Sequence, residues 1–256
     1  MFKKSSVYFL IIATVVTISI CANVTKAQGI AEKGLVSYWS FNDGTIKGKT
    51  VSDLLGKNDG TLVGNPKIVN GKYGNALEFN GTSDYVDVPD DKSLQLWETY
   101  TLEAWIYQNE SKSSRIIDKI TAGTADGPHL DTHPGTTLRS CAGACISNKT
   151  QYSLKEWHHV VMTFDNGDVK FYLDGSFDGG GNAPSPLSGN SNPLRIGADS
   201  NGQNLFNGII DEVRIYNRAI DEAEVKQNMK SDGFAAVNPD EGLGITWGEI
   251  KRDISK

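Results

Sequence analysis

Net positive charge, cysteine and long apolar runs are all scarce in this chain of 256 residues. It has 25 Lys and Arg against 31 Asp and Glu, which gives a formal net charge of −6. Proteins that bind nucleic acid through its phosphates need a basic surface, so this balance argues against a nucleic-acid partner. The three cysteines are not followed by further ligands at finger-like spacing, which argues against a zinc site.

A single long apolar run stands near the N-terminus. Two lysines precede the apolar residues 7–21, and small and polar residues with "TKA" before Gln28 follow. This pattern predicts a signal peptide over residues 1–27, and therefore a secreted or extracellular protein with no membrane span after cleavage. Cleavage would remove three lysines and no acid, which moves the formal charge from −6 to −9.

Two cysteines remain after the predicted cleavage, Cys141 and Cys145 in the segment "CAGAC". In an oxidising compartment we expect a disulfide bond between them. The alternative is a pair of small buried thiols.

Short segments of alternating apolar and polar residues recur along the rest of the chain, separated by turn residues. They predict strands over residues 35–41, 75–81, 84–90, 100–108 and 193–198 and a hairpin over 157–175 around "DNGD". Residues 221–230 carry a capping pattern and predict one short C-terminal helix. Residues 178–193 are rich in glycine and proline and predict a loop. The fold class that follows is all-β, an antiparallel sandwich of two sheets with one short C-terminal helix.

Several of these segments together resemble the laminin-G-like jelly-roll domain of the concanavalin A-like lectin and glucanase fold. They are "GLVSYWSFNDG", "NDGTLVGNPKIVNGKYGNALEFNGTSDYVDVPD", "YTLEAWIY", "EWHHVVMTFDNGDVKFYLDG" and "FNGIIDEVRIYNRAIDEAEVKQ". The resemblance places a jelly-roll domain at residues 34–230 and leaves residues 231–256 as a C-terminal tail. It implies extracellular use, carbohydrate or extracellular protein as partner, and often a structural calcium ion. Residues 117–152 do not match the family pattern.

Strand alternation raises a question about Asp211. In the segment "NGIIDEVRIY" the two-residue repeat places Asp211 on the same face as the apolar Ile209, Val213 and Ile215. A buried carboxylate is costly without a cation or several hydrogen-bond donors, so the position needs a partner.

The resemblance pairs the first and last strands, and this would bring Asp43 close to Asp211. Two neighbouring carboxylates repel each other, and a calcium ion would relieve both the repulsion and the burial. We therefore expect calcium at Asp43 and Asp211, with further oxygens from Asn42, Asn58 and Gly60. The alternative is that the two carboxylates merely accept hydrogen bonds from turns.

Two further groups of residues are candidates for ligand binding. In "HLDTH", His129, Asp131 and His133 alternate, so on one strand they would project from one face and could line a polar pocket or bind a metal. A solvated strand face is the alternative. Trp105 and Tyr107 share another face, where aromatic rings could stack on sugars; the alternative is that both are packed in the interior.

We find no catalytic residues in the sequence. The paired-carboxylate pattern of the hydrolases of this fold is absent, and Glu103 beside Trp105 has no partner carboxylate in register. No nucleophile elbow is present, and His158 and His159 are expected to be structural. The function predicted is a secreted, non-catalytic binding module for a glycan or a cell-surface partner, stabilised by calcium. The alternatives are a polysaccharide-active hydrolase or lyase with an unrecognised site in residues 117–152, and an adhesion module with no small ligand.

Overall fold

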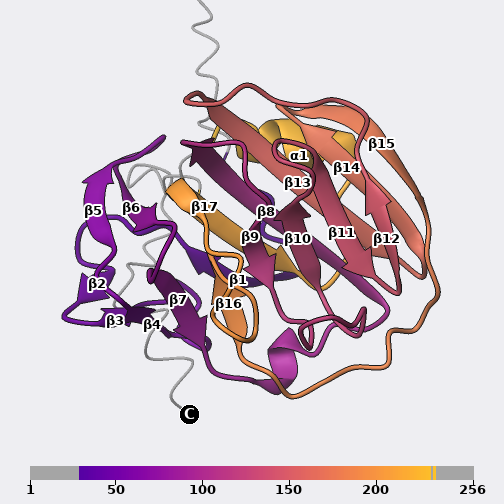
Figure 1. Cartoon of the computed structure of the whole chain (residues 1–256), viewed down its shortest axis with the longest axis horizontal. Coiled ribbons are helices and arrows are strands. Elements are labelled where there is room, and N and C mark those ends of the chain that lie inside the picture. The colour runs from indigo at the N-terminus through magenta and orange to yellow at the C-terminus, as the bar shows by residue number, and fades with distance from the viewer. Residues whose placement is uncertain (1–28, 232, 235–256) are drawn as a thin grey trace, which may run out of the picture.

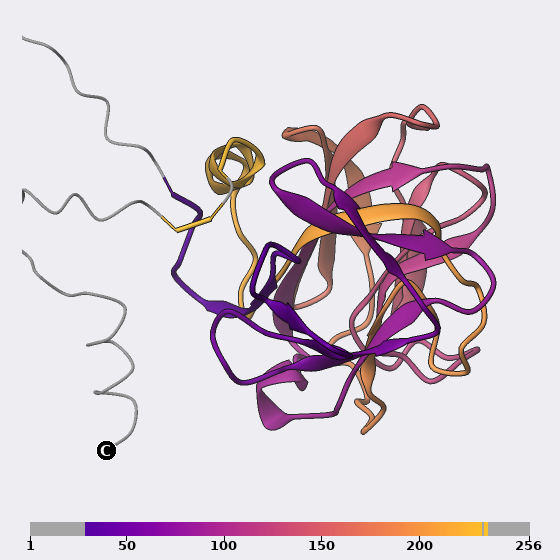
Figure 2. The same cartoon turned by 90° about the vertical axis from the view of Figure 1, so that its left-hand side faces the viewer.

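The computed structural model describes residues 29–231, 233 and 234, and this part forms a sandwich of two antiparallel sheets (Figure 1, Figure 2). The predicted signal peptide and nearly all of the predicted tail lie outside the described residues. None of the helices in the described part is both long and apolar enough to cross a bilayer.

The first sheet consists, in the described chain, of β1 (Leu35–Trp39), β5 (Lys67–Asn70), β6 (Asn75–Asn80), β8 (Thr99–Gln108), β13 (Trp157–Asp165), β14 (Asp168–Leu173), β15 (Ser176–Asn182) and β17 (Asn207–Tyr216). Its order is β15-β14-β13-β8-β17-β6-β5, and β1 also pairs with β17. Sheet strands that are far apart in sequence, such as β8 and β17, lie side by side at its centre.

The second sheet contains the remaining described strands, β2 (Ile46–Lys47), β3 (Thr50–Val51), β4 (Gly60–Val63), β7 (Tyr85–Val88), β9 (Ser114–Asp118), β10 (His129–Thr132), β11 (Leu138–Ala142), β12 (Ala144–Ser147) and β16 (Leu194–Ile196). Its order is β12-β11-β10-β9-β16-β7-β4-β3-β2. A short 3-10 helix, η1 (Lys92–Leu94), links β7 to β8.

The core lies between the two sheets, and the predicted alternation holds where the strands are regular. Leu102, Ala104 and Ile106 of β8 are buried in the main apolar cluster, as the two-residue repeat predicts. The β13–β14 hairpin turns at Asn166 and Gly167, with φ of 48° and 98°. Positive φ at both central positions matches the twist of the flanking strands, which confirms the predicted hairpin.

The strands predicted from the sequence are incomplete: β2, β3, β4, β5 and β9 were not predicted, and two further regions differ from the prediction. Residues 117–152, for which the sequence predicted no strands, supply β10, β11 and β12 and complete one edge of the second sheet. The predicted loop over residues 178–193 begins later than expected, because β15 runs to Asn182 and pairs with β14. Its three glycines have no side chains to alternate, so the strand left no periodic signal.

The predicted C-terminal helix is confirmed as α1 (Glu222–Met229), capped by a reciprocal pair of bonds between Asp221 and Glu224. It covers the outer face of the first sheet (Figure 2), where Val225 packs with Val161 and Tyr216 in a second apolar cluster. Burying a large apolar side chain contributes about 1.5–3 kcal/mol, so this cluster ties the helix to the sheet.

Candidate functional site

The middle of β17 has a β-bulge, at the point where its neighbour on one side changes from β6 to β1. Asp211 pairs with Trp105 and Arg214 pairs with Glu103, so β17 has one residue more than β8 in this interval. Glu212 in the bulge has a φ of 54°. The extra residue reverses the alternation, and Asp211 lies on the outer face of the first sheet beside Trp105. The prediction that it shares a face with Val213 and Ile215 is therefore wrong.

Burial on this outer face still makes the charged form of Asp211 energetically unfavourable. Its side chain is fully buried, Oδ2 accepts a hydrogen bond of 3.1 Å from the backbone N–H of Tyr73, and Oδ1 has no hydrogen-bond partner. Loss of hydration raises the pKa of Asp211 to about 7; the Tyr73 N–H opposes this rise and the nearby charge of Glu212 adds to it. Near neutral pH this carboxylate is thus poised between its charged and neutral forms.

Strand pairing brings Asn42 and Asp43 to the turn over residues 71–75, which also hydrogen-bonds Asp211. Because β6 pairs with residues 207–210 of β17 and β1 pairs with residues 213–216, β1 ends beside the bulge where β6 begins. The N–H of Asn75 donates to Asn42 Oδ1 at 2.8 Å, and the Asn75 amide donates to Asp43 Oδ1 at 2.6 Å. The turn over residues 71–75 therefore contacts Asn42, Asp43 and Asp211.

Two of the predicted calcium ligands lie in a different environment. The carbonyl of Asn58 accepts a hydrogen bond of 2.9 Å from Trp39 Nε1, and its side chain bonds to Ser37 and Ser93. Gly60 belongs to β4 in the second sheet and faces the side chains of Val86 and Val88. The contacts of Asn58 and Gly60 do not include Asp211, so the structure separates them from the other three residues.

The remaining residues fit a calcium ion better than a softer metal. Within the described residues there is no cluster of three or more His, Cys, Asp or Glu side chains suited to a metal. Asp211, Asp43 and Asn42 would supply two carboxylates and an amide, with carbonyl oxygens from the turn over residues 71–75. Calcium accepts this kind of mixed oxygen set, and the unpartnered Oδ1 of Asp211 gives it an anionic ligand.

A buried ionic network occupies the outer face of the first sheet next to the bulge. Arg214 donates to Glu103 Oε1 at 2.9 Å and also pairs with Glu212. Tyr38 OH donates to Glu212 at 2.5 Å, and Asn228 of α1 donates to Glu103 Oε2 at 2.7 Å. Burial alone would raise the pKa of Glu103, but Arg214 and the other partners hold it below its usual range. Glu103 is thus a charged structural group that is inaccessible to a ligand.

The predicted trio "HLDTH" does not assemble. His129 and Asp131 are both buried, whereas His133 is exposed beyond the end of β10, where its Nδ1 lies 2.8 Å from Ser113 Oγ. Asp131 pairs with Arg115 and Arg139, and these cations help to hold its pKa well below the usual range despite burial. A carboxylate already neutralised by two guanidinium groups is a poor metal ligand, so the pocket or metal interpretation is not supported at these residues.

The two candidate aromatic residues differ in exposure. Trp105 is only 4% exposed, because Tyr73 and His159 pack on it and Lys72 Nζ lies 4.2 Å from its ring centroid. It is therefore an interior residue. Tyr107 is half-buried and its ring centroid lies 5.8 Å from that of Trp157, which is also half-buried. Trp157 could not be predicted as a site residue from the sequence, because it is brought to Tyr107 by the pairing of strands far apart in the chain.

The predicted disulfide bond is confirmed. Cys141 and Cys145 face each other across the β11–β12 hairpin and are joined through their sulfur atoms. The backbone N–H of Cys141 also donates to His129 Nδ1 at 2.8 Å, which connects the hairpin to β10.

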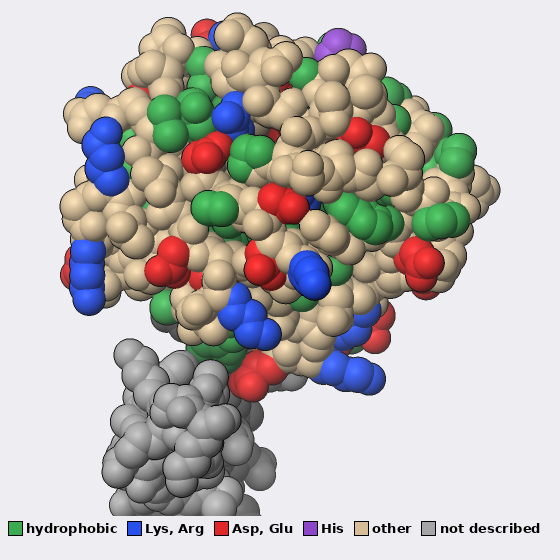
Figure 3. Space-filling view, turned by 90° about the horizontal axis from the view of Figure 1, so that it is seen from below, with side chains coloured by type: hydrophobic (Ala, Val, Ile, Leu, Met, Phe, Trp, Pro, Cys, Tyr) green, Lys and Arg blue, Asp and Glu red, His purple; other side chains and the backbone are tan. Residues whose placement is uncertain are grey.

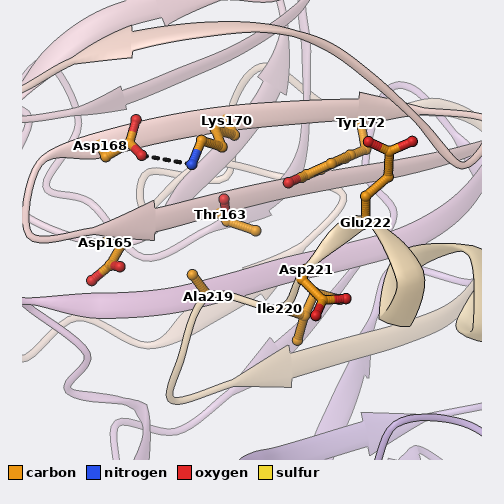
Figure 4. Close-up of a pocket in the computed structure, with 9 residues that line it drawn as sticks. All are labelled: Thr163, Asp165, Asp168, Lys170, Tyr172, Ala219, Ile220, Asp221 and Glu222. Carbon is orange, nitrogen blue, oxygen red and sulfur yellow. Dashed lines mark ion pairs between the residues drawn. The ribbon is translucent and has the colours of Figure 1, made fainter.

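A cavity of about 210 Å³ lies at the other end of the outer face, between the β13–β14 hairpin and the start of α1 (Figure 4). Asp165, Asp168, Asp221 and Glu222 line it, and Asp168 pairs with Lys170 at 2.8 Å. The Asp221 carboxylate caps α1, so the helix N-terminus is already satisfied from within. On the face seen in Figure 3, acidic and basic side chains are interspersed.

The fold has two antiparallel sheets, a first strand that pairs with the last, and a short helix after the last strand. A comparison with known families agrees with this fold. Residues 80–226 match the family model of the concanavalin A-like lectin/glucanases superfamily. The chain belongs to this superfamily.

The proteins similar to this chain include an adhesion receptor and enzymes that act on glycans. The chain is 30% identical over 171 residues to the adhesion G-protein coupled receptor V1 of Danio rerio, which covers 59% of this chain but 3% of the receptor. Domain 4 of AbnA, an extracellular arabinanase from Geobacillus stearothermophilus in complex with arabinotriose, has a TM-score of 0.60 at 22% identity and covers 76% of this chain and 98% of that domain.

Another similar structure is the Trypanosoma rangeli sialidase in complex with sialic acid, with a TM-score of 0.64 at 21% identity, covering 80% of this chain and 34% of the sialidase. At these identities the likeness of the solved structures establishes the fold. Because the chain spans a small part of the receptor, the receptor's own activity does not transfer to it.

Proposed function

We propose that this protein is an exported, non-catalytic binding module that recognises a glycan or a glycan-bearing extracellular partner. The observation that carries the proposal is the half-buried ring pair of Tyr107 and Trp157. It lies on a sheet face whose neighbouring part is sealed by α1 and the ionic network. Aromatic rings that stay accessible on a rigid sheet are suited to stack on the apolar faces of sugars.

The relatives support both parts of this proposal. A similar domain is known in complex with arabinotriose, which favours a saccharide as ligand. The similarity to an adhesion receptor and to a domain of an extracellular enzyme favours use outside the cell.

The state of the buried acids favours binding over catalysis. Glycoside hydrolysis needs two carboxyl groups that flank the scissile bond, about 5–10 Å apart. Glu103 accepts hydrogen bonds on both oxygens, and Asp131 is held by two guanidinium groups. Both are buried, so neither can serve as nucleophile or acid towards a substrate at the surface.

A retention and hydrolysis assay tests the proposal. Purified protein is run in native gels containing arabinan, xylan, galactan, mannan or β-glucan, and the same polysaccharides are assayed for released reducing ends. Retardation in at least one gel without released reducing ends is the expected result. Released reducing ends would refute the non-catalytic assignment, and unchanged mobility in every gel would refute glycan binding.

We further propose that calcium binds at Asp211, Asp43 and Asn42 and stabilises the end of β1 against the turn over residues 71–75. The support is the buried Asp211 carboxylate, whose Oδ1 lacks a hydrogen-bond partner and whose pKa is raised to about 7. A divalent cation would hold this group in its charged form and would connect β1, β6 and β17 at the bulge.

A further inference from the structure

One end of the outer face of the first sheet carries a continuous row of accessible side chains across four strands. Trp157 pairs with Tyr107, Tyr107 pairs with Ile209, and Ile209 pairs with Glu78. All four side chains are half-buried. Residues directly opposite each other on neighbouring strands lie about 5 Å apart, so the row forms one amphipathic strip.

A pair of amides lies two residues beyond this row. The Asn109 backbone N–H donates to the Asn207 carbonyl at 2.9 Å, and the Asn109 side chain donates to Asn207 Oδ1 at 3.1 Å. The other ends of the two amides, Asn109 Oδ1 and Asn207 Nδ2, make no hydrogen bond within residues 29–231, 233 and 234. They present one acceptor and one donor side by side, about 6–7 Å along the strands from Tyr107 and Ile209.

Two charged residues in or next to the row already contact another side chain. Glu78 lies 3.8 Å from Lys67 Nζ, and Lys72 lies over the ring of Trp105. The whole chain has a formal charge of −6, which repels anionic polysaccharides at low salt. These charges favour an uncharged ligand.

The angle between the two rings restricts the form of that ligand. The planes of Tyr107 and Trp157 are inclined at 61°. Two rings at this angle cannot both lie flat against the planar surface of a crystalline polysaccharide. They can contact one sugar unit from two sides, or two successive units of a twisted soluble chain.

We infer that this row binds a soluble, uncharged polysaccharide chain, with Tyr107 and Trp157 stacked on a sugar ring. Asn109 Oδ1 and Asn207 Nδ2 then hydrogen-bond neighbouring hydroxyl groups of an adjoining unit. A paired acceptor and donor suits vicinal hydroxyls, each of which can both donate and accept. This inference rests on the proposed glycan-binding function and specifies its location and ligand class.

The experiment compares variants with matched controls in the same affinity gels, together with a pull-down on crystalline cellulose and a gel containing polygalacturonate. The test variants are Tyr107→Ala, Trp157→Ala and the double Asn109→Ala/Asn207→Ala. Trp157→Phe is the conservative rescue. The controls are Phe177→Ala, an aromatic residue that is 50% exposed on β15 of the same sheet, and Asn201→Ala in an exposed turn. Thermal melts establish that each variant is folded.

For a neutral soluble polysaccharide that retards the wild type, we expect each ring-to-Ala variant to bind about tenfold more weakly or worse, as for aromatic hot spots. Trp157→Phe should retain most of the affinity and the controls all of it, while cellulose and polygalacturonate should not bind. Wild-type binding that survives both ring variants would overturn the assignment of the row and leave glycan binding intact. Wild-type binding to polygalacturonate alone would overturn the uncharged-ligand inference and leave glycan binding intact. Absence of wild-type binding to every polysaccharide, polygalacturonate included, would overturn both proposals.

Discussion

The substitution Asp211→Asn separates the cost of burying this carboxylate from the benefit of a bound cation. The pKa is raised from 3.8 to about 7 in the folded state, and each pKa unit corresponds to 1.36 kcal/mol. Because the folded pKa is the higher one, this group favours folding most below about pH 4. That contribution is lost as the pH rises to about 7, and by then the loss is about 4 kcal/mol in the absence of a cation.

Calcium bound only to the folded state acts in the opposite direction. At a hundredfold excess of ion over Kd the stabilisation is about 2.7 kcal/mol. For a domain of this size 1 kcal/mol corresponds to about 2–4 °C in Tm, so calcium should raise the wild-type Tm by about 5–11 °C. Asp211→Asn should remove this response, because an amide is a weaker calcium ligand and carries no charge.

The assay is differential scanning calorimetry at pH 5 and pH 8, in chelator and in calcium. In chelator at pH 8 Asp211→Asn should melt above the wild type, since it removes the penalty for burying a charge. In calcium at a hundredfold excess over Kd this difference should narrow from about 4 to about 1 kcal/mol, because only the wild type is stabilised by the ion. At pH 5 the advantage of the variant in chelator should shrink, since Asp211 is then largely neutral in the folded wild type.

Glu212→Gln is unsuitable as a control, because Glu212 accepts from Tyr38 and pairs with Arg214 inside the ionic network. Asp118→Asn is the control on the second sheet, since it changes another buried carboxylate of raised pKa and should leave the calcium response intact. It also removes the ion pair with Arg115 at 3.0 Å, so the comparison is of the calcium response and not of the absolute Tm. A wild-type Tm that is the same in chelator and in calcium, with Asp211→Asn below it in both, would refute the reasoning. Hydrogen bonds alone would then hold Asp211.

Three further predictions concern stability. Arg214→Ala should lower the free energy of unfolding, measured with denaturant, by about 3–5 kcal/mol, because it leaves buried carboxylates without their cation. Arg195→Ala, at a partly exposed ion pair, should lower it by at most about 1 kcal/mol. Reduction of the Cys141–Cys145 disulfide should lower the free energy of unfolding by no more than about 2 kcal/mol, because the loop that it closes is short. The far-ultraviolet circular dichroism spectrum should stay unchanged. Burial raises the pKa of Asp118 to about 6, so in chelator the wild type should lose about 3 kcal/mol relative to Asp118→Asn as the pH rises from about 4 to above 6; equal pH profiles would contradict this.

Features that depend on neighbours in sequence could be predicted from the chain. The β13–β14 hairpin follows from an Asn-Gly turn between alternating residues, and α1 follows from the capping residues Asp221 and Glu224. The disulfide bond joins cysteines four residues apart, so the hairpin alone brings them together. In each case the determining contacts lie within a few residues.

The candidate sites depend on contacts between distant segments, and there the sequence was less informative. Alternation placed His133 with His129 and Asp131, but β10 ends at Thr132 and the repeat does not continue past it. The guanidinium groups that pair with Asp131 come from two neighbouring strands. Likewise, Trp157 becomes a partner of Tyr107 only through the pairing of β13 with β8.

The bulge in β17 explains why Asp211 was placed on the wrong face, and it also has a local signal in the sequence. The apolar residues that reach the core are Ile210, Val213 and Ile215, a spacing of three and then two. No regular strand can bury all three on one face, whereas one extra residue at Glu212 allows it. A non-glycine residue at positive φ costs about 1–3 kcal/mol. An unpaired carboxylate in the apolar core costs several kcal/mol, so the bulge is the cheaper arrangement. It moves Asp211 out of the core to the junction of β1, β6 and β17, beside the turn over residues 71–75 that also contacts Asn42 and Asp43.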